Sequence, residues 1–367
     1  MISVFLIDDS VLIRKRITRI LDSDRRIQVI GSASNGEEAL QKLETIKPDV
    51  ITLDVEMPKI NGLEFLKLIG KKSDIPIIML SALTKQGADV TIKALELGAI
   101  DFICKPTASD PTQMEKFSKE LILKIRSAAL MKKDSKIQRP AAASNGSSAA
   151  RPSASALSSI DLSSFKKKLS NPAVAIGIST GGPKTLLHVI PEIPADFPAP
   201  IFVAQHMPQG FTKSLAERLD SISKIQVKEA RNGEAVKPGT CYIAPGDNHL
   251  TVMNMSLSKG KMVKVSDQPR ESLYKPSVDI MFESIAEIYG GDAIAIVMTG
   301  MGTDGTKGIK VIRNRGGKTI AEDKSSCIVY GMPRSVIEAG LADFVLPAPD
   351  IPSLLKSLLK PGAVMSK

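Results

Sequence analysis

The sequence lacks the marks of a membrane-spanning, secreted or disulfide-bonded protein. It has no apolar run of the roughly eighteen residues that a membrane helix needs, so no transmembrane segment is predicted. The chain reaches Asp8 and Asp9 without a basic flank, so no signal peptide is expected. The three cysteines, Cys104, Cys241 and Cys327, are odd in number, far apart and without CxxC spacing. Reduced thiols in a cytoplasmic protein are therefore expected.

The sequence also lacks a folded basic segment, although its net charge is +10. Residues 1–130 carry 19 basic and 18 acidic side chains, whereas residues 131–170 carry 8 basic and 2 acidic ones. A nucleic-acid-binding domain would place its positive charge on a folded helix or sheet. Here most of the excess lies in a segment with few large apolar side chains, so no nucleic-acid partner is predicted.

The composition predicts two domains and a tether. A chain of 367 residues is long for one compact core. Residues 139–153 are rich in Ala, Ser, Pro and Gly, which predicts a flexible tether over residues 128–170 between domains at 1–127 and 171–367. The basic run at residues 165–169 is interpreted as a solvated end of this tether, with docking on an acidic partner as the alternative.

Short apolar runs alternate with amphipathic stretches on both sides of the tether, which is typical of parallel α/β sheets. The predicted strands of the first domain are residues 3–7, 28–33, 50–54, 77–81 and 102–104. Those of the second are residues 173–178, 201–205, 240–244, 293–299, 317–321 and 344–346, with a β-hairpin over 253–264. The predicted fold class is α/β, with a flavodoxin-like doubly wound sheet followed by a Rossmann-like doubly wound parallel sheet.

Charged and hydroxyl side chains end four predicted strands of the first domain. Asp8 and Asp9 end the first strand, Asp54 the third and Ser81 the fourth, and Lys105 follows the fifth. Ligand sites gather at the carboxyl ends of strands in such sheets. Three clustered carboxylates repel one another unless a hard cation such as Mg²⁺ joins them. The lysine and the hydroxyl are suited to hold phosphoryl oxygens.

The segments at residues 8–10, 53–62, 81–82 and 105–106 resemble the bacterial receiver domain, over about residues 1–125. The resemblance implies that Asp54 is the phosphoacceptor and that Mg²⁺ binds to Asp8, Asp9 and Asp54. It also implies that Ser81 and Lys105 contact the phosphoryl group. Phe102 falls where the family has its switch aromatic, and a core phenylalanine is the alternative.

In the second domain, Ser179 lies in a glycine-rich turn between a predicted strand and a predicted helix, in the sequence GISTG at residues 177–181. Glycines permit a sharp turn, and the helix N-terminus supplies free N–H donors, which suits a serine nucleophile. A loop that binds phosphate or nucleotide through its backbone is the alternative.

A serine nucleophile needs a base, and the chain has three histidines. His206 follows the predicted strand at residues 201–205 and is therefore favoured. His188 lies in the helix after Ser179 and is expected to point away from it, and His249 is interpreted as a turn residue with a surface role. Asp304 follows the strand at residues 293–299 and would orient the imidazole, with a helix cap as the alternative. The order Ser, His, Asp differs from that of the α/β-hydrolases and argues against that fold.

Three motifs, at residues 177–182, 205–211 and 298–305, resemble those of the chemotaxis protein-glutamate methylesterase family. Residues 242–249 and 275–279 also match the family pattern, and the similarity covers about residues 171–360. A receiver ahead of this domain is the architecture of that family. The resemblance implies a triad of Ser179, His206 and Asp304, with the Met301 N–H at the oxyanion and Thr180 beside His206.

The resemblance further implies a cytoplasmic enzyme recruited to membrane receptor arrays, without a cofactor for the ester chemistry. Its substrates would be methylated glutamates of chemoreceptors (methyl-accepting chemotaxis proteins), with glutamine deamidation as a second activity. A chemotaxis histidine kinase would phosphorylate Asp54 and release a block that the receiver places on the esterase. The rival interpretations are a DNA-binding response regulator, a nucleotide-binding module, and another esterase or peptidase.

Overall fold

The computed structural model describes residues 1–70, 73–106, 111–137, 169–255 and 260–359 and forms two compact units, residues 1–144 and 145–367. Residues 138–168 of the predicted tether lie outside the described residues, and residues 128–137 belong to helix α5 (Pro111–Ile137). No helix in the described ranges is both long enough and apolar enough to cross a membrane.

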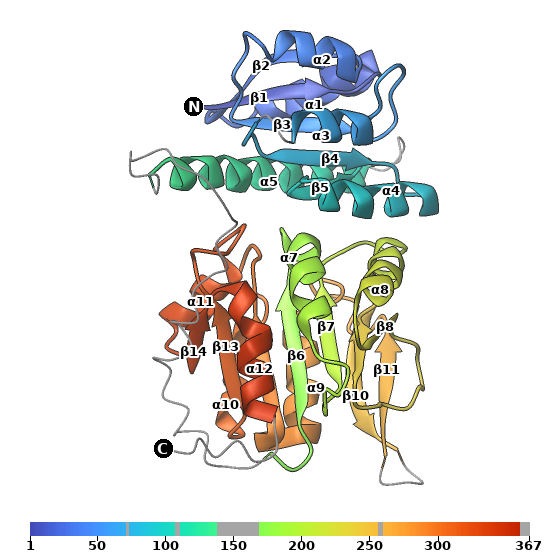
Figure 1. Cartoon of the computed structure of the whole chain (residues 1–367), viewed down its shortest axis with the longest axis vertical. Helices are drawn as coiled ribbons and strands as arrows, with labels where there is room; N and C mark the ends of the chain where they lie inside the picture. Colours follow the sequence, from blue (N-terminus) through green and yellow to red (C-terminus); the bar gives the residue numbers. More distant parts are fainter. Residues whose placement is uncertain (71–72, 107–110, 138–168, 256–259, 360–367) are drawn as a thin grey trace, which may run out of the picture. The chain divides into compact units, whose positions relative to one another are not determined.

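The first unit is a parallel sheet of five strands with helices on both faces (Figure 1). Its strands are β1 (Ile2–Ile7), β2 (Ile27–Ala33), β3 (Val50–Asp54), β4 (Ile77–Ser81) and β5 (Asp101–Cys104), in the order β2-β1-β3-β4-β5. Helices α1 (Val11–Asp22) and α5 cover one face, and α2 (Gly36–Lys42), α3 (Gly62–Ile69) and α4 (Lys85–Glu96) cover the other. The flavodoxin-like prediction is confirmed, and the strand order reverses between β1 and β3.

Side-chain caps fix the start of the first four helices of this unit. Helices α1 to α4 begin after residues whose side chains accept a hydrogen bond from a backbone N–H in the first turn: Ser10, Asn35, Asn61 and Thr84. At α3 the bond is reciprocal, because Glu64 accepts from the Asn61 N–H. These caps hold the short loops at the carboxyl edge of the sheet, where Asp8 and Asp54 lie.

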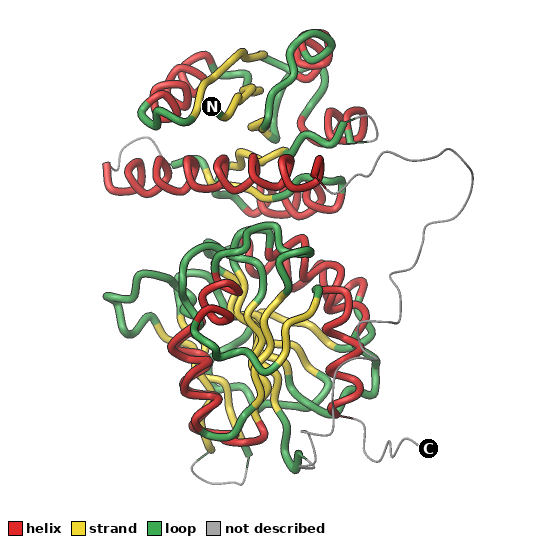
Figure 2. Tube along the Cα trace, turned by 90° about the vertical axis from the view of Figure 1, so that its left-hand side faces the viewer, coloured by secondary structure: helices red, strands yellow, loops and turns green. Residues whose placement is uncertain are grey.

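The second unit is a seven-stranded parallel sheet between two layers of helices, which Figure 2 shows edge on, with an antiparallel hairpin beside it. The sheet order is β14-β13-β12-β6-β7-β9-β8. The strands are β6 (Ala173–Ile178), β7 (Ile201–Gln205), β8 (Gln226–Glu229), β9 (Thr240–Ile243), β12 (Ala293–Val297), β13 (Lys318–Glu322) and β14 (Phe344–Leu346), and the hairpin is β10 (His249–Asn254) with β11 (Lys261–Ser266).

Six α-helices and three short 3₁₀ turns complete the described part of the second unit. Helices α7 (Gly182–Val189), α8 (Phe211–Ile222) and α12 (Ile351–Leu359) lie on one face of the sheet, and α9 (Val278–Tyr289), α10 (Thr306–Asn314) and α11 (Met332–Glu338) lie on the other. The 3₁₀ turns are η2 (Ile190–Glu192), η3 (Gly290–Asp292) and η4 (Ala348–Asp350). The parallel doubly wound prediction is confirmed.

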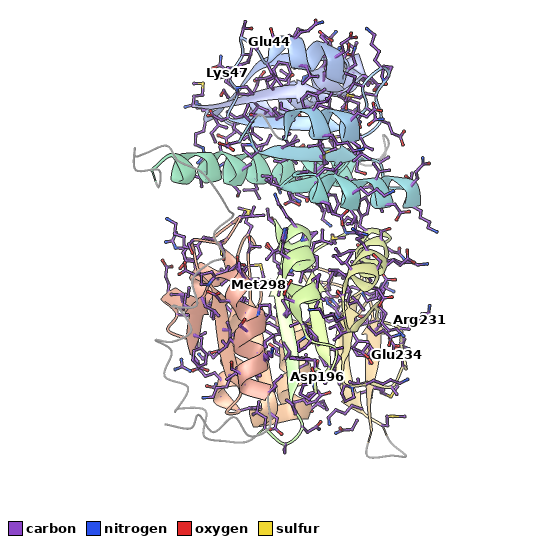
Figure 3. The ribbon with its side chains drawn as sticks, viewed as in Figure 1. Glu44, Lys47, Asp196, Arg231, Glu234 and Met298 are labelled. Carbon is purple, nitrogen blue, oxygen red and sulfur yellow. The ribbon has the colours of Figure 1, made fainter. Side chains whose placement is uncertain are left out.

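Two differences from the predicted strands have physical reasons. The edge strand β8 was not predicted, because its residues QVKE are mostly polar and only Val227 is buried. Strand β12 ends at Val297, two residues earlier than predicted, because the Thr299 N–H turns to the carboxylate of Glu322. Met298, which is labelled in Figure 3, lies at this point and is fully buried.

Strand β6 approaches the start of α9 so closely that Gly177 has no room for a side chain. A Cβ atom at Gly177 would lie 2.1 Å from Cγ1 of Val278. We expect Gly177→Ala to lower the free energy of unfolding by about 1–3 kcal/mol, as overpacked cores do. Urea denaturation of the chain, followed by circular dichroism, would measure this loss.

A second variant tests the cause of that loss. Val278→Ala removes the methyl groups with which the added side chain collides. In the Val278→Ala background, Gly177→Ala should therefore cost much less than in the parent chain. An equal cost in both backgrounds would contradict the steric explanation.

Candidate active site

The three residues predicted to act together in the second unit follow three adjacent strands. Ser179 follows β6, His206 follows β7, and Asp304 lies in the loop between β12 and α10. The order β12-β6-β7 places these carboxyl ends side by side. The chain leaves β6 toward β7 and leaves β12 in the opposite direction, so the strand order reverses here. Such switch points are where open α/β sheets hold their ligands.

The side chains of these residues form a continuous chain of hydrogen bonds. His206 Nδ1 lies 3.0 Å from Ser179 Oγ, and His206 Nε2 lies 2.8 Å from Asp304 Oδ2. A carboxylate accepts hydrogen bonds, so Nε2 carries the hydrogen and Nδ1 is free to accept the hydroxyl hydrogen of Ser179. This arrangement can pass a proton from the serine to the imidazole while the carboxylate fixes the tautomer.

The buried Asp304 carboxylate is held by the first turn of α9. Burial by itself would raise the pKa of Asp304, but hydrogen bonds from His206 and from backbone N–H groups hold it below its usual value. Helix α10 begins at Thr306, and Gly305 before it is the N-cap without a side-chain hydrogen bond, so Asp304 does not cap the helix that follows it. Besides His206, its donors are Ser277 Oγ at 3.1 Å and the N–H groups of Val278 at 2.8 Å, Asp279 at 3.0 Å and Gly305 at 3.1 Å.

Two backbone N–H groups beside the serine are unpaired within the part of the chain that the structure describes, those of Thr180 and Met301. Thr180 directly follows Ser179. Gly300, just before Met301, is so close that a Cβ atom there would lie 2.8 Å from Ser179 Cβ. Free N–H donors near a nucleophile can stabilise an oxyanion. The Thr180 carbonyl accepts a hydrogen bond from Thr299. The expected place of the Thr180 residue beside His206 stays a prediction.

Gln205, the last residue of β7, holds the backbone on both sides of the serine–histidine contact. Its buried Nε2 donates to the Ser179 carbonyl at 2.9 Å and to the His206 carbonyl at 3.1 Å. Gly182 packs against the same amide, because a Cβ atom there would lie 2.0 Å from Gln205 Oε1. Gln205 was not predicted as a site residue, although a polar side chain that ends a buried strand was an available signal.

Glu322, the last residue of β13, supports the same turn from the other side. Its carboxylate is fully buried and accepts from the Thr299 N–H at 2.7 Å and from Ser326 Oγ at 2.8 Å. Thr299 in turn accepts from the Ser179 N–H and donates to the Thr180 carbonyl. Burial raises the pKa of Glu322. Like Gln205, Glu322 was not predicted as a site residue.

The other two histidines do not contact Ser179. His188 is exposed, and its Nδ1 lies 2.7 Å from the Lys184 carbonyl, as expected for a residue that points away. His249 was interpreted as a surface residue, and this is wrong, because its side chain is 1% exposed at the start of β10. It is buried because β10 packs against α9.

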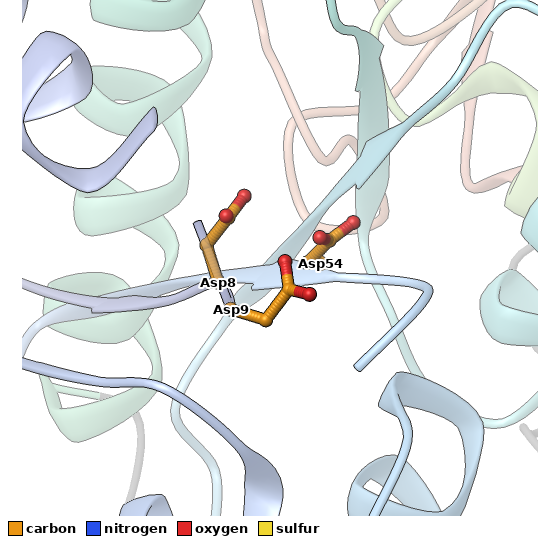
Figure 4. Close-up of side chains that lie close together, drawn as sticks. All are labelled: Asp8, Asp9 and Asp54. Carbon is orange, nitrogen blue, oxygen red and sulfur yellow. The ribbon is translucent and has the colours of Figure 1, made fainter. Parts of the chain in front are cut away.

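The first unit brings its three predicted carboxylates together at the switch point between β1 and β3 (Figure 4). Carboxylate oxygens of Asp8, Asp9 and Asp54 all lie within 4.8 Å of one another. Lys105 Nζ lies 2.8 Å from Asp8 Oδ2 and 2.7 Å from Asp54 Oδ2. A set of clustered carboxylate oxygens fits the preference of Mg²⁺ for hard ligands.

The two remaining residues predicted for this pocket are buried. Ser81 Oγ donates to the Gly87 carbonyl at 3.2 Å and accepts from Thr91 Oγ1 at 2.8 Å, so it is bound to α4. Its contact with a phosphoryl group therefore stays a prediction and requires a change of partners. Phe102 is 3% exposed, with Lys124 Nζ 5.4 Å from its ring centroid.

Burial raises the pKa of Asp54 to about 6, although Lys105 beside it acts in the opposite direction. Above this pH the carboxylate is ionised in both states, and its burial then disfavours the folded chain. Below about pH 3.8 the carboxyl group is protonated in both the folded and the unfolded chain. Asp54→Asn should therefore raise the free energy of unfolding at pH 7 by up to about 3 kcal/mol, with the gain disappearing near pH 4.

Urea denaturation in metal-free buffer at pH 7 and pH 4 measures this effect. Asp89→Asn is the matched control, because Asp89 is an exposed residue of α4, and no gain is expected from it. An Asp54→Asn chain no more stable than the parent at pH 7 would contradict the stated cost of the buried charge.

The fold and the two sites define a response regulator whose effector is a doubly wound α/β domain with a serine–histidine–aspartate site, and comparison with known proteins agrees. The family model described as CheB methylesterase matches residues 174–355, and that of the response regulator receiver domain matches residues 4–116. The chain belongs to the CheB methylesterase family, with a receiver domain ahead of the methylesterase domain.

Its relatives include a Thermotoga maritima protein, 46% identical over 359 residues, which are 98% of each chain. A Bacillus subtilis protein is 43% identical over 363 residues, which are 98% of this chain and 99% of that one. Both are named protein-glutamate methylesterase/protein-glutamine glutaminase. The solved CheB methylesterase catalytic domain of Thermotoga maritima is 52% identical, with a TM-score of 0.50, over 52% of this chain and 99% of that one.

Proposed function

We propose that this chain is a phosphorylation-activated serine hydrolase that removes methyl groups from esterified glutamate side chains of chemoreceptors. The observation that carries the proposal is the hydrogen-bonded chain Ser179–His206–Asp304 at the switch point of the second sheet. The names of the relatives supply the substrate class, because nothing in the side-chain geometry selects a glutamyl ester over another ester.

In the mechanism, Ser179 Oγ attacks the ester carbon while its proton passes to His206 Nδ1. Asp304 keeps the imidazole in the Nε2–H form and stabilises the imidazolium. The Thr180 and Met301 N–H groups donate to the tetrahedral oxyanion, at about 2.7–4 kcal/mol for a donor of this kind. Methanol leaves with the proton from His206. A water molecule, deprotonated by His206, then hydrolyses the acyl-enzyme and restores glutamate and Ser179.

The same residues support deamidation of glutamine. The amide nitrogen takes the place of the methoxy oxygen and leaves as ammonia with the proton from His206. Both reactions pass through the same acyl-enzyme, so one site serves both. The glutaminase part of the relatives' printed name supports this second activity.

The receiver supplies the control. We assign Asp54 as the phosphoacceptor, a chemotaxis histidine kinase as the phosphodonor, and Asp8, Asp9 and Asp54 as the residues that would hold Mg²⁺. The bound cation would offset the charge of the phosphoryl oxygens, which Lys105 and Ser81 also contact. The predicted division into domains at 1–127 and 171–367 leaves a tether between them. The entropy lost when a tether brings two domains together grows only slowly with its length. We place the enzyme in the cytoplasm, at membrane receptor arrays.

Release of labelled methanol from methyl-labelled receptor membranes tests the proposal, with and without acetyl phosphate and Mg²⁺. The unaltered chain should release methanol, and the phosphodonor should increase the rate. Asp54→Asn should lose the increase. An unaltered chain that releases no methanol in either condition would refute the substrate assignment, and an Asp54→Asn chain that still responds would refute the phosphoacceptor assignment.

A further inference from the structure

An aromatic ring covers one face of the imidazole of His206. The Tyr274 ring lies parallel to it, with 4.4 Å between ring centroids and an interplanar angle of 2°. The hydrogen bonds of His206 to Ser179 and Asp304 lie in the plane of the imidazole and restrain tilting out of that plane only weakly. A ring stacked on the face blocks this tilt, and an aromatic face also attracts the imidazolium that forms in the reaction.

Tyr274 also contacts the segment that carries the Met301 N–H. A Cβ atom at Gly302 would lie 3.0 Å from the Tyr274 hydroxyl oxygen, so the phenol lies directly against the backbone at this position. Gly302 has a φ of 87°, in the left-handed region that glycine adopts most easily. The Tyr274 side chain therefore touches both the base and the loop that carries the unpaired Met301 N–H.

The segment that carries Tyr274 has no regular secondary structure, and a buried histidine fixes it at two points. It runs over residues 267–276, between β11 and α9. His249 Nδ1 accepts from the Ser277 N–H at 3.2 Å, and His249 Nε2 lies 3.2 Å from the Pro269 carbonyl oxygen. A carbonyl cannot donate, so Nε2 carries the hydrogen and the imidazole is neutral. Burial lowers the pKa of His249, which favours this neutral form.

On the basis of the proposed function, we propose that Tyr274 positions the catalytic imidazole and that His249 holds the loop that carries Tyr274. Neither residue reacts with the substrate. Tyr274 acts through His206, and His249 acts through the backbone at Pro269 and Ser277. The second contact also supports Asp304, because Ser277 Oγ donates to that carboxylate.

Two substitutions at Tyr274 separate the ring from the hydroxyl. Tyr274→Leu removes the aromatic face and should lower kcat for ester hydrolysis about tenfold with little change in KM, since in this proposal the ring acts on the imidazole and not on the substrate. Tyr274→Phe keeps the ring and should stay within about threefold of the unaltered chain. Activity is measured with acetyl phosphate and Mg²⁺ present. Equal kcat values for the unaltered chain and Tyr274→Leu would overturn the positioning role.

Nuclear magnetic resonance of ring-labelled histidine gives a readout that does not depend on activity. The chain has three histidines, so three sets of ring signals are expected. Tyr274→Leu should shift the His206 signals, because they lose the ring current of the stacked phenol, and Tyr274→Phe should leave them close to their original positions. Unshifted His206 signals in Tyr274→Leu would overturn the stacking. If the unaltered chain shows no Ser179-dependent hydrolysis, the proposed function fails. The His206 signals alone then decide whether Tyr274 stacks on His206.

His249→Gln tests the anchor, with His188→Ala as the matched control. His249→Gln should lower kcat and shift the His206 signals in the same direction as Tyr274→Leu, and it should cost less in the Tyr274→Leu background than alone. His188 is exposed, and in the described part of the chain its hydrogen bond is to its own helix, so its loss should change neither quantity. A folded His249→Gln chain with unaltered His206 signals would overturn the anchor. If His249→Gln does not fold, His249→Asn is measured in the same way, with the same outcomes.

Discussion

Replacement of Ser179 by alanine is expected to lower ester hydrolysis by about 10⁴-fold or more, because no other group of the site can form the acyl-enzyme. His206 Nδ1 accepts its hydrogen bond from Ser179 Oγ and would have no partner after the substitution. The residual rate would come from the N–H donors and from substrate binding. Methanol release with phosphodonor present measures the loss.

A matched control and a double variant make this prediction specific. Ser221 is an exposed serine of α8 whose hydrogen bonds within the described residues stay in its own helix, and Ser221→Ala should keep the full rate. Because Ser179 and His206 act as one unit, the double variant with both replaced by alanine should lose about as much as Ser179→Ala alone. A double variant whose loss equals the product of the two single losses would contradict the assignment of the nucleophile. A Ser179→Ala chain with near-parental activity would contradict it as well.

Asp304→Asn is expected to lower kcat by about 10⁴-fold while leaving the fold intact, which is the size seen when the orienting acid of a serine protease is made an amide. The amide oxygen can accept from Ser277 and from the N–H groups near Oδ1, and this turns the NH₂ group toward His206, with loss of the hydrogen bond that Oδ2 accepts from the Val278 N–H. The imidazole must then accept at Nε2 and carry its hydrogen at Nδ1. In that tautomer it cannot take the proton from Ser179.

The tautomer change can be seen directly. Imidazole ¹⁵N shifts distinguish a protonated nitrogen from a bare one, so the His206 signals of Asp304→Asn should show the hydrogen moved from Nε2 to Nδ1. Asp279→Asn is the control, because Asp279 reaches Asp304 through its backbone N–H and its side chain accepts from Gly308. A loss of activity equal for both variants, with no tautomer change in Asp304→Asn, would mean that Asp304 supports the helix alone.

The sequence predicted the triad positions because each follows a short buried strand, and the carboxyl ends of parallel strands meet at one edge. Strands β6 and β7 were found with the bounds that the structure has. The order of the strands could not be read, because the pairing of β12 with β6 joins residues more than a hundred positions apart. The motifs that resemble the methylesterase family indicated that these three residues act together, which the periodicity of apolar residues could not show.

The supporting residues could not be predicted for the same reason. Tyr274 stacks on a residue 68 positions earlier, and His249 holds Ser277, 28 positions later. Such contacts depend on how the loop at residues 267–276 folds over the sheet edge. The periodicity of apolar residues does not predict the path of a loop. Gln205 and Glu322 were nearer to prediction, because each is a polar residue that ends a buried strand, as Asp54 is in the first unit.

In the first unit, the clustering of Asp8, Asp9 and Asp54 was predicted, but the partners of Ser81 were not. The pattern placed the hydroxyl at the end of β4 and could not show that Thr91, ten residues later, would bind it. Sequence fixes the position of such a group on the sheet edge and not its rotamer.

Mass spectrometry after reaction with a fluorophosphonate tests the proton relay most directly, because the reagent labels only a serine that a neighbouring base activates. With acetyl phosphate and Mg²⁺ present, the adduct should form on Ser179 in the unaltered chain, be slowed by methylated receptor, and be absent from His206→Ala. An adduct on a different residue, or equal labelling of Ser179 in His206→Ala, would contradict it.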